Sequence, residues 1–199
     1  MIVLFSAESV EASAWSVSFK AGTYQPRTVD YDYEYGHTGN VRTDLELDYK
    51  ITPRLEAGVS IGYFRDSGPV RSASGRISAV SQELTLVPTA LLLQYDFNFD
   101  ESQLFVPYLG GGIARVTYRH VVGEGEAEVG GFNGYQLRTG IKFLLNRVEP
   151  DAASRLNREW GVTRSYLLLE GQFSSVNDFG GQGVDLGGWS YLAGIALEF

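Results

Sequence analysis

The sequence has no cysteine, one methionine, six prolines and only two histidines among its 199 residues. Without cysteine the chain has no disulfide and no thiolate metal site, and two distant histidines do not make a recognisable zinc site. No apolar run approaches the roughly 18 residues of a membrane-spanning helix. The net charge of −8 argues against a nucleic-acid groove, which needs clustered lysine and arginine. We therefore expect no cofactor, no metal and no nucleic-acid partner.

Glycine and aromatic residues are abundant instead. The chain has 24 glycines, 12 tyrosines, 11 phenylalanines and three tryptophans. This mixture suits the short strands, tight turns and aromatic girdles of a membrane β-barrel. The mean hydropathy of −0.10 does not argue against a membrane location, because barrel strands alternate lipid-facing with lumen-facing residues.

The most informative segment is residues 188–199, GWSYLAGIALEF. Every second residue is apolar or aromatic, from Trp189 and Tyr191 to Phe199. A soluble domain rarely keeps such a pattern at its end, because a fraying strand gains little burial there. The last strand of a membrane barrel must keep it, since that strand closes the wall against the first and leaves no open edge in hydrocarbon. The pattern therefore predicts a strand that faces lipid.

Further segments show the same alternation in whole or in part. The predicted strands are residues 15–25, 42–51, 55–64, 81–99, 105–118, 135–145, 165–174 and 188–199. Long connections alternate with short ones, as in outer-membrane barrels with long outer loops and short periplasmic turns. The predicted fold is all-β: an eight-stranded antiparallel up-and-down transmembrane β-barrel in the bacterial outer membrane, with both termini periplasmic.

Two segments depart from the strand pattern. Residues 148–161 place Pro150 at a helix start and Gly161 just past its end, which predicts a short periplasmic helix between the sixth and seventh strands. Residues 1–14 combine a short apolar run with a stretch of small residues, and we interpret them as a leader or a signal-peptide remnant. Residues 15–199 are then a single barrel domain.

The alternation also assigns the two faces of the wall. In residues 42–51 acidic side chains alternate with leucine and tyrosine, so we expect the charged face to point into the lumen. The predicted polar lumen network consists of Lys20, Asp44, Glu46, Asp48, Lys50, Glu56, Arg138, Lys142 and Glu170. An eight-stranded barrel is just wide enough for side chains to fill, which favours paired charges over an open pore. The alternative is a gated conduit in which the acidic ladder of residues 44–48 attracts cations.

The opposite face supplies the contacts with lipid. The predicted membrane-facing aromatic anchors are Trp15, Tyr49, Tyr63, Tyr95, Tyr108, Trp189, Tyr191 and Phe199. Tyr108 is included because the other parity of its strand would turn Arg115 into lipid, at a cost of about 2–4 kcal/mol near the midplane.

Residues 81–99 contain a change of parity. Leu84 and Leu86 alternate out of phase with Leu91 and Leu93, so Pro88 marks either a bulge or an inward apolar patch. The possible apolar lumen residues are Leu84, Leu86 and Leu92.

Residues 30–35 alternate acid with tyrosine. Such a loop could form a receptor or adhesin patch, or hold divalent cations against lipopolysaccharide phosphates. We favour an aromatic girdle that runs into a solvated loop.

The central segment resembles the OmpW family. The resemblance rests on residues 87–97, a strand that begins near proline and ends in an aromatic pair, and on the following Pro-Tyr-Leu-Gly-Gly-Gly of residues 107–112. The glycine-rich strand and the terminal Phe199 are also similar to OmpA-like and OmpX-like eight-stranded barrels. The resemblance implies a narrow barrel with a partly apolar lumen that passes or binds small hydrophobic molecules. Its implied partners are outer-membrane lipid, lipopolysaccharide and, through the strand ending at Phe199, the barrel-assembly machinery.

Several functions fit this architecture. The first is a narrow channel or binding conduit for small hydrophobic solutes, and the second is a structural or adhesive barrel with a plugged, charge-paired lumen. A lipid A-modifying enzyme would need an activated serine beside a histidine base, and neither His37 nor His120 lies in a His-x-Ser arrangement. A soluble lipocalin-type barrel would need an apolar interior, which the acidic face of residues 42–51 contradicts. We therefore expect a membrane barrel that is not an enzyme.

Overall fold

The computed structural model describes residues 14–27, 31, 35, 39–71, 77–100, 103–181 and 184–199. Of the predicted leader, residues 1–14, only Ala14 is among the described residues. His37 lies outside them. Of the acid–tyrosine loop at 30–35, the described residues are Tyr31 and Tyr35.

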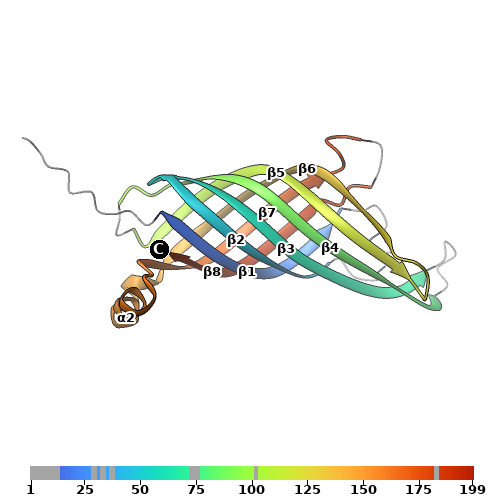
Figure 1. The fold of residues 1–199 in the computed structure, drawn as a ribbon, viewed down its shortest axis with the longest axis horizontal. Helices are drawn as coiled ribbons and strands as arrows, with labels where there is room; N and C mark the ends of the chain where they lie inside the picture. Colours follow the sequence, from blue (N-terminus) through green and yellow to red (C-terminus); the bar gives the residue numbers. More distant parts are fainter. Residues whose placement is uncertain are drawn as a thin grey trace, which may run out of the picture.

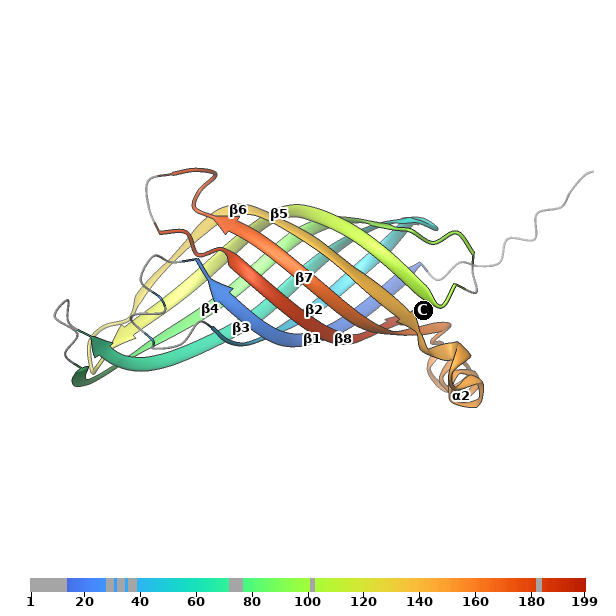
Figure 2. The same cartoon turned by 180° about the vertical axis from the view of Figure 1, so that it is seen from behind.

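Eight antiparallel strands close into a barrel within the described residues (Figures 1 and 2). Their bounds are β1 Trp15–Pro26, β2 Asn40–Thr52, β3 Leu55–Arg71, β4 Ile77–Asp96, β5 Phe105–Val122, β6 Glu128–Leu144, β7 Arg164–Val176 and β8 Gly188–Glu198. Each strand pairs with the next, and β8 pairs with β1. The predicted fold class is confirmed.

The register shows how strongly the strands are inclined. A row of paired residues starts at Trp15 of β1 and passes through Tyr49 of β2 and Ala57 of β3. It continues around the wall to Trp189 of β8 and returns to β1 at Gln25. A row that returns to its own strand well above its starting point means that the strands tilt against the barrel axis, as closure of a small barrel requires.

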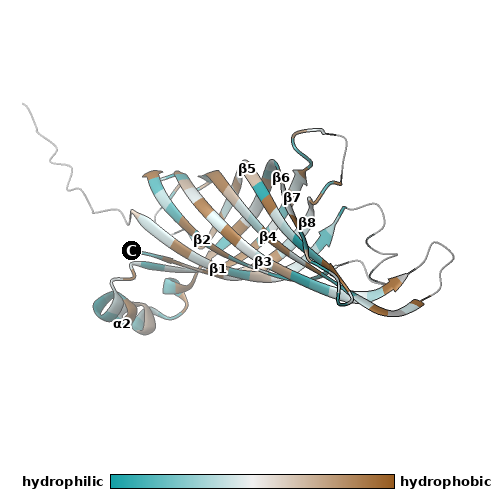
Figure 3. Ribbon diagram, turned by 45° about the vertical axis from the view of Figure 1, so that its right-hand side comes forward, coloured by the Kyte–Doolittle hydropathy of each residue, from teal (hydrophilic) through white to brown (hydrophobic). Residues whose placement is uncertain are grey.

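Apolar side chains cover the outer surface of the wall. Tyr108 aside, the predicted aromatic anchors are all between 40% and 56% exposed, so they face outward. At the termini end, ring pairs such as Trp15–Tyr49, with centroids 5.0 Å apart, form one girdle. Nearer the loops, Phe173 and Trp189 pair at 4.9 Å. Figure 3 shows hydrophobic and hydrophilic residues alternating along the strands, which is the pattern of a wall in contact with lipid.

Strand β4 keeps one parity from Gln82 to Asp96. Its ladder with β5 runs without a register shift through the Pro88–Val116 pair, so Pro88 marks no bulge there. Leu86 and Leu92 are buried, while Leu91 is exposed. The out-of-phase leucines are therefore an inward apolar patch, the second of the two alternatives.

Four strands rise beyond the rim of the barrel. The β2–β3 ladder ends at the Arg42–Phe64 pair and the β6–β7 ladder at the Gly134–Val176 pair. Beyond these points β3, β4, β5 and β6 continue to pair with one another (Figures 1 and 2). We call this part, residues 65–71, 77–85, 117–122 and 128–131, the projecting sheet. Strands β3 and β6 are longer than predicted because they include it.

The helix α2, Pro150–Trp160, lies between β6 and β7 at the termini end, as predicted. It follows a 3-10 turn, Leu145–Arg147, and ends at Gly161, whose φ of 71° is the left-handed conformation that favours glycine. In Figures 1 and 2 it lies to the side of the barrel end and does not cover the opening. No helix of the described residues is long and apolar enough to span a membrane.

Candidate functional site

The candidate site is the interior of the barrel, where the structure gathers every residue of the predicted polar lumen network. Its centre is Glu46 of β2, which accepts hydrogen bonds from Lys20 Nζ at 3.0 Å and from Arg138 Nη1 at 2.5 and 2.6 Å. Arg138 Nη2 also lies 3.8 Å from Asp48 Oδ1. A buried ion pair offsets its desolvation only with such close geometry. The contacts therefore act as a brace across the lumen between β1, β2 and β6.

Glu170 of β7 forms the other side of this brace. Its carboxylate accepts hydrogen bonds from Lys20 Nζ at 2.8 Å, Tyr108 OH at 2.7 Å and Gln172 Nε2 at 2.7 Å. Lys20 thus bridges Glu46 and Glu170, and its side chain is only 1% exposed. Charge-assisted hydrogen bonds of this kind are stronger than neutral ones, and they fix the relative positions of the strands that carry them.

The prediction that Tyr108 faces lipid is wrong. Tyr108 is 2% exposed and points inward, whereas Arg115 lies on the outer face. The prediction assumed that Arg115 would lie near the midplane. Arg115 instead pairs with Thr89 and Asn133, a polar row at the upper edge of the apolar belt. An arginine at that level can extend its charged end toward water, so its outward position does not carry the midplane cost.

Gly140 makes room for Tyr108. The two residues are paired across β5 and β6, and a Cβ built at Gly140 would lie 2.5 Å from the Tyr108 ring. In the sequence Gly140 occupies the same face as Arg138 and Lys142. A glycine between two inward cations was the signal that a large side chain from a neighbouring strand enters the lumen there.

A second charged cluster lies closer to the termini. Lys142 Nζ of β6 is 3.0 Å from Glu56 Oε2 and 2.7 Å from Asp96 Oδ2. Gln94 Nε2 donates to the same two carboxylates, at 3.2 and 2.7 Å. The cluster connects β3, β4 and β6, so it braces the side of the barrel opposite Lys20.

Two further ion pairs lie above and below these clusters. Arg42 binds Asp44 in a bidentate pair, with Nε–Oδ1 at 2.7 Å and Nη2–Oδ2 at 2.8 Å, and it also donates to Ser190 Oγ at 3.2 Å. Lys50 Nζ lies 2.6 Å from Glu198 Oε1, which connects β2 to β8. Sequence reasoning missed Arg42 and Asp96. Each lies an even number of residues from a side chain that was predicted to point inward: Arg42, the first residue of its predicted strand, is two residues before Asp44, and Asp96 is four residues after Leu92. A stricter use of the alternation would therefore have found both.

Apolar side chains fill the half of the interior nearer the loops. The buried cluster consists of Tyr24, Tyr31, Tyr35, Phe64, Leu86, Ala90, Leu92, Ala114, Val116, Val176 and Leu186, and Leu84, Tyr118 and Phe132 pack against it. It includes all three predicted apolar lumen residues, with Leu84 at its periphery. We call this set the apolar plug. Tyr24 and Phe64 meet edge to face at 5.1 Å within it.

Tyr31 and Tyr35 belong to the apolar plug. Their rings stack at 4.8 Å, and Tyr31 OH donates a hydrogen bond to Asp66. Burial, together with this hydrogen bond, raises the pKa of Tyr31 above its ordinary value. The prediction of an aromatic girdle in this loop is wrong for both tyrosines, because burying a ring on the apolar interior removes more apolar surface from water than exposure at the rim would.

The interior leaves little free space. One cavity in the charged half, lined by Lys20, Glu46 and Tyr108 among others, and one beside the apolar plug each hold about 10 Å³. That volume is room for about one water molecule. The interior of the described barrel is therefore filled by side chains.

Among the described residues no group of three or more His, Cys, Asp or Glu could hold a metal ion. His120, on the projecting sheet, lies 3.4 Å from Gln82 Oε1.

Comparison with known proteins relates the barrel to solved structures by shape. No family model and no curated protein sequence matches the chain. Neisserial surface protein A (NspA) superposes with a TM-score of 0.57 at 14% identity, covering 94% of this chain and 99% of that one. The N-terminal β-barrel domain of Pseudomonas aeruginosa OprF superposes with a TM-score of 0.51 at 13% identity, covering 92% and 97%. At these identities the likeness shows the fold: this chain is similar to small eight-stranded outer-membrane β-barrels.

Proposed function

We propose that this chain is a bacterial outer-membrane barrel with a closed interior, which presents the projecting sheet outside the cell as an interaction surface. The loops then face outward and both termini face the periplasm. The charged network and the apolar plug have a structural role, and the chain is not an enzyme. Apolar residues over the whole outer wall, with aromatic girdles at both ends, support the membrane location.

One observation carries the proposal of a closed interior. Buried ion pairs join strands on opposite sides of the lumen, and the cavities between them have room for about one water molecule each. A polar solute would have to break several charge-assisted hydrogen bonds at once in order to pass. Breaking even one buried pair costs about 3–5 kcal/mol, so passage would need a separate opening step.

The projecting sheet has the features of an interaction surface. On its outer face Arg65 and Arg119 approach Glu83 at 2.5 and 3.9 Å, so this face carries a charged cluster. Within the described residues, the β6 edge beyond Gly134 carries no further strand. An open strand edge can pair with an extended segment of another protein. Val129 is exposed on this edge and offers an apolar contact to such a segment.

Electrical recording and adherence together test the proposal. Refolded protein should migrate at different positions on a gel with and without heating, as a folded membrane barrel does, and should give no steady conductance in a planar bilayer. Cells that produce the chain should aggregate, or adhere to a protein-coated surface, more than cells that lack it.

A trimmed variant tests the projecting sheet itself. Arg65 pairs with Thr85 and Thr117 with Gly131, so residues 66–84 and 118–130, which include Glu83, Arg119 and Val129, can each be replaced by an Asn-Gly turn. We expect this variant to keep its heat-modifiable migration and to lose adherence. Undiminished adherence of the trimmed barrel would contradict the interaction surface, and a steady open conductance of the untrimmed one would contradict the closed interior.

The apolar plug favours a second candidate, a conduit for small hydrophobic solutes. An apolar solute could replace Leu86 or Leu92 in the upper interior without an unpaired charge resulting, because that half is lined by apolar side chains. Faster uptake of a hydrophobic dye by cells that produce the chain, lost on substitution of Leu86 by Trp, would support this candidate. Equal uptake by producing and non-producing cells would exclude it.

Other partners follow from the membrane location. We propose that lipopolysaccharide surrounds the loop end of the wall and that the barrel-assembly machinery recognises the terminal strand ending at Phe199. Backbone pairing of Phe199 N with Trp15 O, at 2.9 Å, places that residue at the seam which assembly must close.

A further inference from the structure

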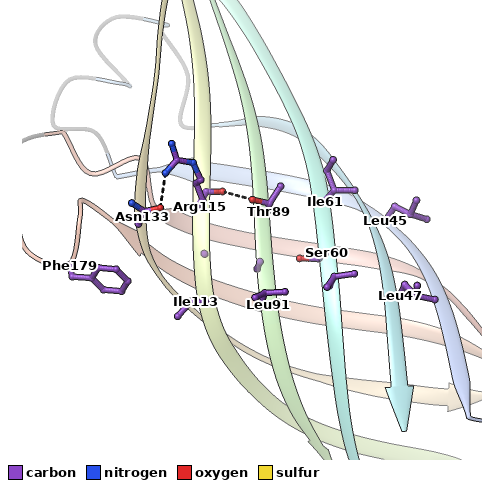
Figure 4. A pocket seen from close by; sticks show the side chains of 13 residues that line it. Leu45, Leu47, Ser60, Ile61, Thr89, Leu91, Ile113, Arg115, Asn133 and Phe179 are labelled. Atoms are coloured by element: carbon purple, nitrogen blue, oxygen red, sulfur yellow. Dashed lines mark hydrogen bonds between the residues drawn. The ribbon is translucent and has the colours of Figure 1, made fainter.

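The outer wall carries a large hollow between β2 and β5. It has a volume of about 620 Å³, within the range of ligand pockets, and aliphatic side chains such as Leu45, Leu91 and Ile113 line it (Figure 4). A second hollow of about 590 Å³ shares Leu47 and Leu91 with the first and continues over glycines of β3 and β5. The two form one groove on the outer surface of the wall.

The upper end of the groove is polar. Arg115 Nη1 donates to Asn133 Oδ1 at 2.8 Å, and Thr89 Oγ1 donates to the Arg115 carbonyl at 3.3 Å (Figure 4). These three residues form the row in which the outer face turns from apolar to polar, and Thr117 and Arg119 lie above it on β5. Arg115 is therefore at the level where lipid headgroups meet acyl chains.

Arg115 differs from the other outward arginines of this region. Arg65 and Arg119 share the carboxylate of Glu83. Arg115 has a neutral hydrogen-bond partner, Asn133, and no carboxylate of the described residues lies within 4.0 Å of its guanidinium. Its remaining N–H donors are available to an anion, and a guanidinium binds phosphate in a bidentate manner.

The β7–β8 loop places an aromatic ring beside the same groove. Asp178 N donates to Asn133 O and Asn133 N donates to Asp178 Oδ1, both at 2.8 Å, so the loop is fixed against β6. Phe179 follows with a φ of 59°, a left-handed conformation that is costly for an aromatic residue, and its side chain is 64% exposed. It lines the groove in Figure 4. Strain of this kind persists where surrounding contacts impose it, often at a binding site.

We propose that this groove binds a phosphorylated, multiply acylated glycolipid of the outer leaflet, of the lipid A type. Its phosphate contacts Arg115, one acyl chain lies in the groove along β3 to β5, and Phe179 covers that chain from the side. The inference rests on the proposed function, because the outward orientation of the loops puts Arg115 in the glycolipid leaflet. An apolar groove that is continuous with the membrane belt and ends in a cation without a direct ion pair matches an acyl chain that is joined to an anionic headgroup.

Native mass spectrometry of the refolded full chain in detergent tests the site, with bisphosphorylated lipid A as the probe. We expect Arg115→Gln to weaken retention of lipid A about tenfold, the loss of one charge-assisted hydrogen bond. Arg119→Gln is the matched control, since it removes an outward arginine of the same strand whose partner is Glu83. Equal retention by the two variants would overturn the proposal.

Two comparisons sharpen the identity of the ligand. Dephosphorylated lipid A should bind as weakly to the wild-type barrel as lipid A binds to Arg115→Gln, and equal binding of both lipids would exclude the phosphate contact. Phosphatidylglycerol should bind more weakly than lipid A, and equal binding would exclude a glycolipid site. Heat-modifiable migration of the same samples reports on the proposed membrane barrel separately from these outcomes.

Phe179→Asn tests the aromatic contact. Asparagine tolerates the left-handed conformation, so the loop should keep its shape while the ring is lost. We expect retention of lipid A to fall about two- to tenfold, the range of an aromatic contact, with no decrease in the denaturant midpoint. Unchanged retention would remove Phe179 from the site.

Discussion

Toward the termini the interior of the barrel is filled mainly by ion pairs, beside a small apolar cluster of Leu144, Tyr166, Leu168 and Ala196, whereas toward the loops it is filled mainly by aromatic and aliphatic side chains. Both halves exclude open space, but by different physical means. Ion pairs such as Arg138 with Glu46 have one good geometry, so they specify which strands face each other across the lumen. Apolar packing is non-directional and tolerates rearrangement. The charged half therefore fixes the architecture, while the apolar half closes it.

The largest expected effect comes from breaking the charged half at Arg138. Arg138→Gln would leave Glu46 with Lys20 alone and remove the cation beside Asp48. We expect the free energy of unfolding to fall by about 3–5 kcal/mol, the cost of breaking a buried pair. Urea unfolding in lipid vesicles measures this. Arg119→Gln on the surface should change it by less than about 0.5 kcal/mol, and an equal loss in both variants would refute a structural role for the buried network.

The apolar half is tested by Leu86→Ala. Leu86 is 1% exposed inside the plug, so its truncation should cost about 2–4 kcal/mol through lost burial and a cavity. The matched control is Leu91→Ala on the same strand, because Leu91 is 56% exposed on the lipid-facing side. The same vesicle unfolding experiment should give a clearly smaller loss for Leu91→Ala. If the lipid-facing truncation costs as much, the plug does not stabilise the barrel.

A double-mutant cycle tests whether the halves are independent. Arg138 and Lys20 share Glu46, so Arg138→Gln and Lys20→Met should be coupled by about 1 kcal/mol or more. Arg138→Gln and Leu86→Ala share no partner, and their effects should add within about 0.5 kcal/mol. Strong coupling in the second cycle would show that the two halves act as one unit.

The smallest effect is expected on the projecting sheet. Glu83→Gln removes the carboxylate that Arg65 and Arg119 share, but both arginine side chains are more than half exposed. Such a pair contributes about 0–1 kcal/mol and is screened by salt. The unfolding midpoint should therefore shift little, and the shift should shrink further at high ionic strength. A large, salt-insensitive loss would place this network among the structural braces.

The face of most strands could be predicted from the sequence, because a wall with lipid on one side and charge on the other imposes a period of two. The terminal strand and residues 42–51 show this most clearly. The inference failed at Tyr108, where the argument depended on the height of Arg115 in the membrane. That height is set by the tilt and register of the whole barrel, which no single strand encodes.

The sequence also did not predict which charged side chains pair with each other. Alternation placed Glu46, Glu56, Arg138 and Lys142 inside, but Arg138 binds Glu46 while Lys142 binds Glu56. These partners face each other across the lumen, so their identity follows from the cross-section of the closed barrel. The projecting sheet was missed for a related reason. Residues 65–71 have polar groups on both faces, including the buried Asp66, so this segment shows no hydrophobic period.

The seam between β1 and β8 has a consequence for how the molecule is made. Trp15 and Phe199 meet there, and Gln25 pairs with Trp189. Strand β1 therefore cannot pair with its second neighbour, β8, until β8 has been synthesised. The entropic cost of joining such remote segments grows only slowly with their separation, but the delay leaves two exposed backbone edges in every intermediate. Sealing the cylinder is thus the step at which a nascent chain is most vulnerable to pairing with the wrong neighbour.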